Sequence, residues 1–306
     1  MPRGRDLADD ARLQGAPHLS LQGLPPSLCA YSVRRIGAYA GPCMRVRRSS
    51  DDAEADIGFA DTGDLNIAAL AHHCGSGSGF VRTWYDQSGF GRNIIQATSG
   101  RQPAIYVDGV VQQTAGGRPA LQGTAGSGTS GSLLRSANTL PTSYATCTLS
   151  TVIEIPTGSE NNRTIFGWAD GANDRTYGKD GSLQFGRWYY STGIKFGSND
   201  ADSELNGFEV DRPIVFHNQF TATSDARSGI RANGVLGGGT SGHGTRTFGG
   251  AGESRFLLFF AQDDGASFEG KISEVILWGE SLDLARGRIL AQDQAAYYRS
   301  VRRWWP

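Results

Sequence analysis

The sequence predicts an all-β protein, an antiparallel β-sandwich with a C-terminal helix and an extended N-terminal arm. Glycine accounts for 43 of the 306 residues, about twice its usual share of ~7%, as expected where tight turns join many short strands. Segments in which apolar and polar residues alternate recur at short intervals through the second half of the chain. Only one long helical pattern follows them, near the C-terminus. Together these observations favour a sandwich of antiparallel strands.

The alternation is clearest in the stretch CTLSTVIEI. Its apolar members include Leu149, Ile153 and Ile155, and the polar residues between them include Ser150 and Glu154. A period of two residues places these two sets on opposite faces of a strand. We therefore predict a strand with one buried face and one solvent-facing face.

Other local patterns define further elements. Residues 44–48, MRVRR, alternate as a strand, and residues 62–75 suit a short helix that ends at a glycine. Asn233 and Gly234 predict a two-residue hairpin turn, because both central positions of a type I′ turn require positive φ. Residues 117–136 are rich in glycine and serine and are interpreted as a loop between two strands.

The final segment predicts a helix that lies against the sandwich. Ser281 can cap its N-terminus, and Asp283 falls in the first turn, where a negative charge is favoured. The apolar residues expected on its buried side are Leu282, Ala285, Ile289 and Ala296.

Composition excludes several classes of function. The 29 basic and 30 acidic residues nearly cancel, so no overall field attracts nucleic acid or an anionic membrane. No apolar run is long enough to span a bilayer, and the N-terminus lacks the apolar core of a secretory signal. Four cysteines without C-x-x-C spacing predict free thiols, and His72-His73 lacks metal-ligand spacing. No cofactor is expected.

Two parts of the chain resemble known families. In FEGKISEV, Phe268, Gly270, Ile272 and Val275 fit the pattern F-x-G-x-I-x-x-V, and with the helix that follows they resemble the closing strand of concanavalin-A-like, laminin-G-like jelly rolls. The segments AYSVRRIGAYAGPCMRVRRSSDDAEADIGF and WYDQSGFGRNIIQA resemble the start of the catalytic domain of α-L-arabinofuranosidase B, glycoside hydrolase family 54, itself a sandwich of this superfamily. The same block resembles tail and virion proteins of tailed bacteriophages.

The resemblance implies a retaining glycosidase, which needs two carboxyl groups about 5–5.5 Å apart. The family's acid/base aspartate corresponds to Asp263 or Asp264, whereas the segment that corresponds to its nucleophile, residues 181–198, contains no Asp or Glu. The family's adjacent cysteine pair is also missing. We therefore expect a protein without hydrolase activity. The alternative is an active arabinofuranosidase whose second carboxylate is Asp180, Asp200, Asp202 or Glu204.

The residues that remain suit a sugar-binding groove. Trp188, Tyr189 and Tyr190 can stack on a sugar face, and Asp263 and Asp264 can accept hydroxyl hydrogen bonds. Each has a structural alternative, because consecutive aromatic residues on a strand must include a core residue, and Asp-Asp-Gly can form a simple turn. Calcium at the two aspartates is a further alternative.

The WYDQSG motif supplies a second set of candidate ligand-binding residues, Asp86, Gln87 and Asn93. The structural alternative is that these side chains hold a loop by bonding to its backbone. We interpret Asp86 first as a loop organiser and second as a ligand contact.

The predicted organisation is an N-terminal arm over residues 1–28, a sandwich over residues 29–300 and a basic-aromatic tail over residues 301–306. Within the sandwich, residues 29–115 form the arabinofuranosidase-B-like block and residues 116–300 the laminin-G-like block. The arm is expected to contact other subunits, and the tail is either an assembly contact or a frayed end.

From these patterns we predict a non-catalytic phage virion protein, associated with a tail or fibre, whose lectin-like sandwich contacts host surface glycans or neighbouring subunits. A homo-oligomer is expected, with no nucleic acid and no membrane insertion. Its expected location is the virion, because a chain without a secretion signal can leave the host by lysis. The alternatives are the arabinofuranosidase described above and a purely structural capsid or tail cement protein.

Overall fold

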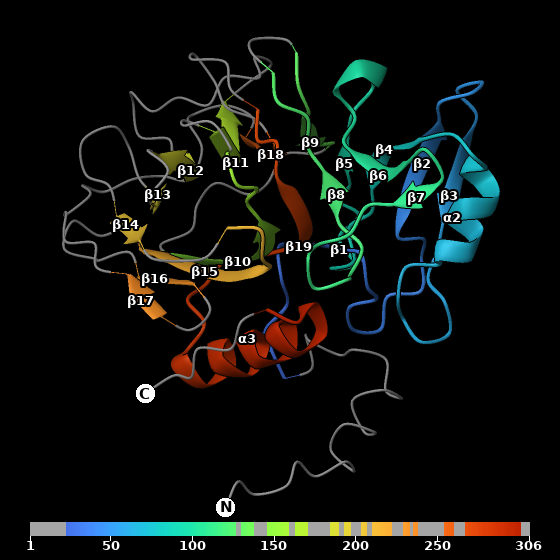
Figure 1. The fold of residues 1–306 in the computed structure, drawn as a ribbon. Helices are drawn as coiled ribbons and strands as arrows, with labels where there is room; N and C mark the ends of the chain where they lie inside the picture. Colours follow the sequence, from blue (N-terminus) through green and yellow to red (C-terminus); the bar gives the residue numbers. More distant parts are fainter. Residues whose placement is uncertain are drawn as a thin grey trace, which may run out of the picture.

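The structure is a computed structural model that describes residues 23–126, 130–137, 146–158, 163–170, 184–189, 193–196, 203–206, 210–221, 229–232, 235–237, 254–259 and 267–300. Every strand pair recorded in these ranges is antiparallel. The α-helices described there are α2 (Ile67–Cys74) and α3 (Leu284–Tyr298) (Figure 1). The predicted all-β class with a C-terminal helix is confirmed.

The first group of strands is built around β19 (Lys271–Trp278). One edge of β19 pairs with β10 (Thr146–Glu154), and the other edge pairs with both β1 (Cys29–Ser32) and β8 (Leu121–Gln122). Beyond β10 the order continues with β15 (Ile214–Thr221), β16 (Gly229–Ala232) and β17 (Val235–Gly237). Strands from the two ends of the chain therefore lie side by side.

The second group runs from the middle of the chain to the N-terminal hairpins. Its order is β14 (Ser203–Asn206), β13 (Gly193–Phe196), β12 (Gln184–Tyr189), β11 (Arg163–Asp170), β18 (Ser254–Leu258), β9 (Leu134–Ser136), β5 (Ile94–Ile95), β4 (Gly79–Trp84), β2 (Met44–Arg48) and β3 (Glu54–Ile57). The strands β6 (Ala104–Val107) and β7 (Val110–Val111) form a hairpin, and β6 pairs with both β4 and β8. It thereby links the two groups. A 3-10 turn, Ser99–Arg101, precedes it.

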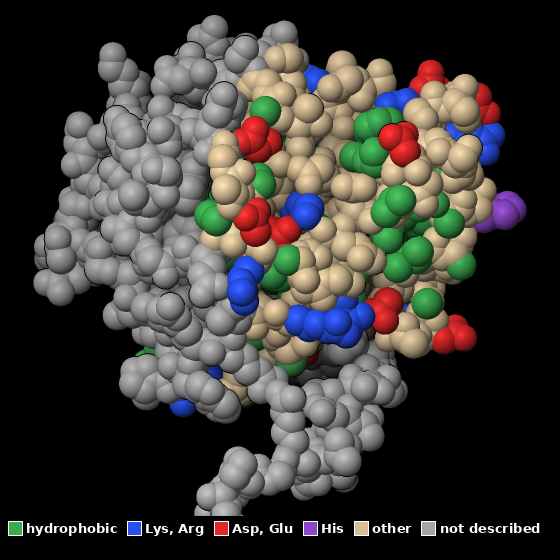
Figure 2. Space-filling view, viewed as in Figure 1, with side chains coloured by type: hydrophobic (Ala, Val, Ile, Leu, Met, Phe, Trp, Pro, Cys, Tyr) green, Lys and Arg blue, Asp and Glu red, His purple; other side chains and the backbone are tan. Residues whose placement is uncertain are grey.

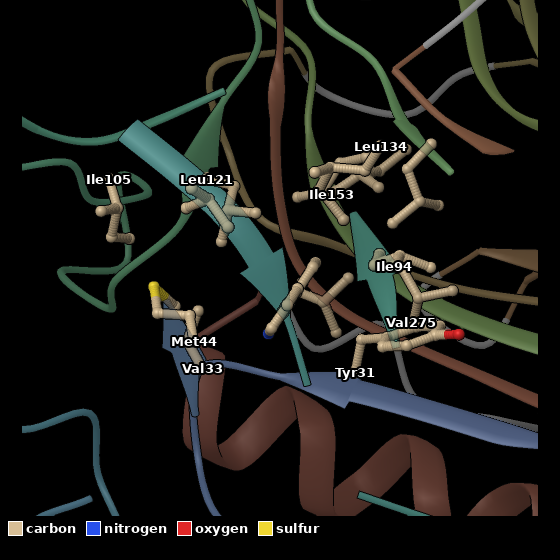
Figure 3. Close-up of a cluster of buried hydrophobic side chains, with 14 of the residues drawn as sticks. Tyr31, Val33, Met44, Ile94, Ile105, Leu121, Leu134, Ile153 and Val275 are labelled. Carbon is tan, nitrogen blue, oxygen red and sulfur yellow. The ribbon is translucent and has the colours of Figure 1, made fainter. Parts of the chain in front are cut away.

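Two hydrophobic clusters hold the layers together. The larger one contains side chains from both groups of strands; Figure 3 labels Tyr31, Val33, Met44, Ile94, Ile105, Leu121, Leu134, Ile153 and Val275. The smaller one joins β1 and β19 to the C-terminal helix, and its members are Ala30, Ile36, Ile276, Trp278, Leu282 and Leu290. Burying one large apolar side chain stabilises a fold by roughly 1.5–3 kcal/mol, so both clusters contribute substantially to the stability of the protein.

Several local predictions are confirmed. The MRVRR segment forms β2, and the short helix α2 ends at Gly75, whose φ of 60° suits a glycine. Strands β16 and β17 pair with Ala232 opposite Val235, as a hairpin requires; Asn233 and Gly234 themselves lie outside the described residues. The glycine-rich stretch at residues 117–136 contributes β8 and β9 at its two sides.

The predicted buried face of the C-terminal helix is wrong in part: Leu282 is buried as predicted and Ala296 is partly buried. Ala285 and Ile289 are exposed, Ile289 to 60%. The residues that face the protein are Leu290, Ala291, Gln294, Tyr297 and Tyr298. The Gln294 amide and the Tyr298 phenol meet a polar surface of the first strand group, so the apolar stripe alone does not decide the orientation. The N-cap is Asp283, not Ser281, because the Asp283 carboxylate accepts a hydrogen bond of 2.8 Å from Arg286 N.

The solvent-facing side predicted for β10 is also wrong. Ser150 is fully buried and Glu154 is only 5% exposed. The helix α3 covers Ser150, whose Oγ accepts a hydrogen bond of 2.8 Å from Gln294 Nε2. Glu154 pairs with Lys271 Nζ at 2.8 Å. The polar residues of this strand therefore lie on a second buried face and not on a face exposed to solvent.

Candidate functional site

The WYDQSG motif forms the connection from β4 to β5, and its aspartate is buried at the centre of that loop. Asp86 is 2% exposed. Its Oδ1 accepts hydrogen bonds from Ala30 N and Ser88 N, each 2.9 Å. Its Oδ2 accepts from Ser88 Oγ at 2.7 Å and from Arg92 N at 2.9 Å. Asn93 Oδ1 in turn accepts from Asp86 N at 2.9 Å. This carboxylate fixes both the loop and the adjoining strand β1.

Gln87 ties the same loop to the segment that follows β1. Its Nε2 donates to the carbonyl oxygens of Ser32 and Arg34, at 2.9 and 3.1 Å, and its Oε1 accepts from Ile36 N at 2.8 Å. Gln87 is 5% exposed. The bonds of Asp86, Gln87 and Asn93 all run to the protein's own backbone or to a neighbouring side chain, which is the geometry of a structural loop; their role as ligand contacts stays a prediction.

The strands that carry the predicted sugar-binding groove lie side by side. Both β12 and β18 pair antiparallel with β11, so these two strands run in the same direction on either side of it. Leu258, the last residue of β18, lies opposite Phe166 of β11, which lies opposite Phe185 of β12. Trp188 is three residues beyond Phe185, so it lies about 10 Å further along the strand direction. The C-terminal ends of β12 and β18 therefore lie at the same end of the sheet.

The structure places the predicted groove residues only in part. Trp188 and Tyr189 lie on β12, opposite Arg163 and Gly193 respectively. Tyr190, Asp263 and Asp264 lie outside the described residues, as do the alternative carboxylates Asp180, Asp200 and Asp202. The remaining alternative, Glu204, lies on β14 opposite Lys195, which is opposite Arg187 of β12.

A buried polar network under α3 was not predicted. The guanidinium of Arg34 contacts Glu274 Oε2 at 2.9 Å, and both side chains are fully buried. Arg34 Nη2 also contacts Asp293 at 2.5 Å. The further members of the network are Ser32, Gln294 and Tyr298, which donate to Glu274, and His217, which contacts Gln294. The members of this network are single polar residues, and the outermost two, Ser32 and Tyr298, are 266 positions apart. They therefore form no motif that could have predicted the network.

The charge of Glu274 follows from these neighbours. Burial alone raises the pKa of this carboxyl, but the Arg34 guanidinium and the hydrogen bonds from Arg34, Gln294 and Ser32 outweigh it, so the pKa is lowered overall. The pair is thus ionised and interacts with α3 on one side and with the strands on the other. It is a structural ion pair and not a catalytic dyad, because the helix closes over it.

The lowered pKa makes stability dependent on pH. A carboxyl whose pKa is lower in the folded than in the unfolded chain stabilises the fold above its unfolded pKa, ~4.3, and this contribution is lost as pH falls through the folded-state pKa. We expect the difference in unfolding free energy between the wild type and Glu274→Gln to be constant near neutral pH and to narrow in acid. Urea denaturation of both proteins across pH measures it. A difference that does not change in acid would contradict this assignment.

Over the ranges described above, no three His, Cys, Asp or Glu side chains are placed to hold a metal ion. His73 Nε2 instead lies 3.1 Å from Val46 O. No helix in these ranges is long and apolar enough to cross a membrane. On the face shown in Figure 2, acidic and basic side chains are interspersed.

In overall structure the chain has the fold of arabinofuranosidase β-sandwich enzymes. A solved arabinofuranosidase complexed with arabinofuranosyl-alpha-1,2-xylobiose superposes with a TM-score of 0.62 at 18% identity, covering 89% of this chain and 62% of that chain. A GH54 α-L-arabinofuranosidase soaked with a cyclic sulfate inhibitor superposes with a TM-score of 0.59 at 16% identity, covering 93% and 65%. At such identities the likeness establishes the fold alone.

Sequence comparison names a particular family for the N-terminal part. The family described as "Alpha-L-arabinofuranosidase B, catalytic" matches residues 19–118. An α-L-arabinofuranosidase of Hypocrea jecorina is 36% identical over 80 residues, and a probable α-L-arabinofuranosidase B of Aspergillus fumigatus is 37% identical over 81 residues. Each match covers 26% of this chain and 16% of the relative. The chain thus matches about a sixth of these relatives' length.

These comparisons correct two predictions. The predicted function, a non-catalytic virion protein of a phage tail or fibre, is contradicted by a match to a catalytic domain and by relatives that are named as arabinofuranosidases. The predicted location on a virion is contradicted because the named relatives are fungal enzymes. The absence of Asp and Glu from residues 181–198 does not outweigh these matches.

Proposed function

We propose that the chain is a glycoside hydrolase of the α-L-arabinofuranosidase type, which removes arabinofuranosyl groups from a glycan. The observation that carries this proposal is the match of residues 19–118 to an arabinofuranosidase catalytic domain. The shared fold over 93% of the chain supports it, because the similarity continues beyond the matched segment. The finer assignment of the sandwich to the concanavalin-A-like jelly rolls is part of the same proposal.

The proposed chemistry is a double displacement with retention. One carboxyl group protonates the leaving oxygen, the second attacks the anomeric carbon, and water then releases the sugar from the second group. Asp263 or Asp264 is the proposed acid/base, because both follow β18 in the chain and correspond to the family's acid/base aspartate. The proposed nucleophile is Glu204, Asp180, Asp200 or Asp202. Of these, Glu204 lies on a strand two positions from β12 in the same sheet.

Release of 4-nitrophenol from 4-nitrophenyl α-L-arabinofuranoside tests the proposal. We expect the wild type to turn over this substrate and Asp263→Asn or Asp264→Asn to be at least ~100-fold slower, the usual contribution of a general acid. One variant among Glu204→Gln, Asp180→Asn, Asp200→Asn and Asp202→Asn should be similarly impaired.

The matched control is Glu54→Gln. Glu54 lies on β3, at the far end of the same strand group, and its carboxylate contacts Arg82 Nε at 3.3 Å. We expect it to retain full turnover. A wild type that is folded and inactive toward this substrate would overturn the proposal, and so would activity that survives in every variant of both carboxylate sets.

A further inference from the structure

A cluster of aromatic and charged side chains lies on the surface where β2 begins and β3 and β4 end. It consists of Tyr39, Arg45, Asp56, Phe59 and Tyr85, and we call it the Tyr39 platform. Arg45 and Asp56 are cross-strand partners on β2 and β3, with side chains 43% and 40% exposed. The three rings are partly exposed. The cluster is thus open to solvent, unlike the network under α3.

The rings of the platform are held in fixed positions. Tyr85 OH donates to Asp56 Oδ1 at 2.7 Å, and Tyr39 OH donates to Pro42 O at 3.1 Å. The Tyr39 ring contacts Phe59 edge to face, with centroids 6.5 Å apart and planes at 88°. The Tyr39 phenol also lies over the backbone of Gly41, where a Cβ would overlap it. Such preorganisation lowers the entropy cost of binding a ligand.

The polar groups between the rings keep free bonding capacity. Arg45 uses Nε and Nη2 for a bidentate contact with Asp56, each bond 2.8 Å, and Nη1 takes no part in it. Partial burial, the bond to Asp56 and the charge of Asp56 raise the pKa of Tyr85 to about 12, so this phenol stays protonated at neutral pH. Planar rings beside paired carboxylate and guanidinium groups suit sugars, which offer apolar faces for stacking and hydroxyls for polar contacts.

The platform is remote from the proposed catalytic strands. Going from β12 through β11, β18, β9 and β5 to β4 takes five strand-to-strand steps, or roughly 24 Å. Figure 1 shows β2, β3 and β4 on the opposite side of the molecule from β12. A ligand that reaches both places must be a polymer and not a single sugar.

We propose that the Tyr39 platform is an accessory binding site for the backbone of a polysaccharide that carries arabinofuranosyl groups. This inference rests on the proposed function for the choice of ligand class. The platform holds the polymer at one side of the sheet while its side groups are removed at the other. Its effect is on affinity for the polymer and not on the chemical step.

Native affinity electrophoresis in gels that contain arabinoxylan tests this inference without requiring turnover. We expect the wild type to be retarded, and Tyr39→Ala and Phe59→Ala to bind the polymer roughly 10-fold more weakly, since each variant removes one ring and the edge-to-face contact that positions the other. Tyr39→Phe keeps the ring and should bind nearly as the wild type does.

Gly41→Ala is the sharpest variant, because it replaces no platform side chain and shifts only the Tyr39 ring, which a Cβ at position 41 would overlap. Its cost in stability should be small, since the atoms that must move are the far end of a side chain. We expect weakened polymer binding. The matched control is Phe90→Ala, which removes a ring that is 55% exposed in the WYDQSG loop and should leave both polymer binding and turnover unchanged.

The outcomes separate this inference from the proposed function. Platform-dependent binding in a protein without turnover would retain the accessory site and overturn the hydrolase. Turnover of the nitrophenyl substrate by a wild type that does not bind arabinoxylan would do the reverse. Equal loss of binding in Phe90→Ala and Tyr39→Ala, or unchanged binding in Tyr39→Ala and Gly41→Ala, would overturn the platform; near-ultraviolet circular dichroism confirms that each variant is folded.

Discussion

Replacing Glu274 by alanine is expected to lower the free energy of unfolding by about 3–5 kcal/mol, the usual cost of removing one partner of a buried ion pair. The variant leaves the fully buried Arg34 guanidinium with Asp293 as its remaining anion, and it removes the acceptor for Ser32, Gln294 and Tyr298. Urea denaturation measures the change. We expect a lower midpoint and the same dependence on urea concentration.

Two controls show whether the loss comes from an unpaired buried charge. The double variant Arg34→Met with Glu274→Leu removes both charges and should recover most of the lost stability, since apolar replacements of buried pairs are often neutral. Glu54→Ala breaks a half-exposed pair with Arg82 and should cost less than about 1 kcal/mol. A double variant as unstable as Glu274→Ala would show instead that the site depends on packing.

Replacing Asp86 by alanine is expected to cost about 3 kcal/mol or more. Hydrogen bonds to a charged group contribute roughly 1.5–3 kcal/mol each, and buried donors left without an acceptor add to the loss. The donors are Ala30 N, Ser88 N, Ser88 Oγ and Arg92 N. Chemical denaturation gives the total, and hydrogen exchange at the Ala30 amide reports the local loosening of β1.

The Asp86 prediction has a graded control in the same loop. Asn93→Ala removes a single acceptor, the one for Asp86 N, and should cost about 1 kcal/mol. Asp86→Asn keeps one carbonyl acceptor and should fall between the two. If Asp86→Ala were no more destabilising than Asn93→Ala, the loop would be held by other contacts, and the ligand-contact interpretation of Asp86 would gain weight.

Local sequence patterns predicted where the strands lie in the chain better than they predicted which face of each strand is buried. Alternation located β10, and MRVRR located β2, because side-chain period depends only on the strand itself. Which face is covered depends on parts of the chain far away. Ser150 is buried because Gln294 of α3 lies over it, and nothing within CTLSTVIEI encodes that helix.

The candidate site shows the same division. The WYDQSG motif lies in the block that matches the arabinofuranosidase model, and it predicted a loop organised by Asp86, since the partners of Asp86 are mostly close in sequence. The Arg34–Glu274 pair joins residues 240 positions apart, so no spacing announces it. The Tyr39 platform is likewise assembled from three separate segments, and only the pairing of β2 with β3 and β4 brings them together.

The position of β19 has a consequence for the order of events during synthesis. This strand is the only recorded partner of β1 in the described part of the chain, and it also pairs with β8 and β10. It follows each of these partners in the chain and therefore leaves the ribosome after them. The edges of β1, β8 and β10 that pair with β19 therefore stay unpaired until residues 271–278 have been synthesised. Contacts between residues this distant in sequence also form slowly. A chain truncated before β19 should be recovered mainly as aggregate or bound to a chaperone.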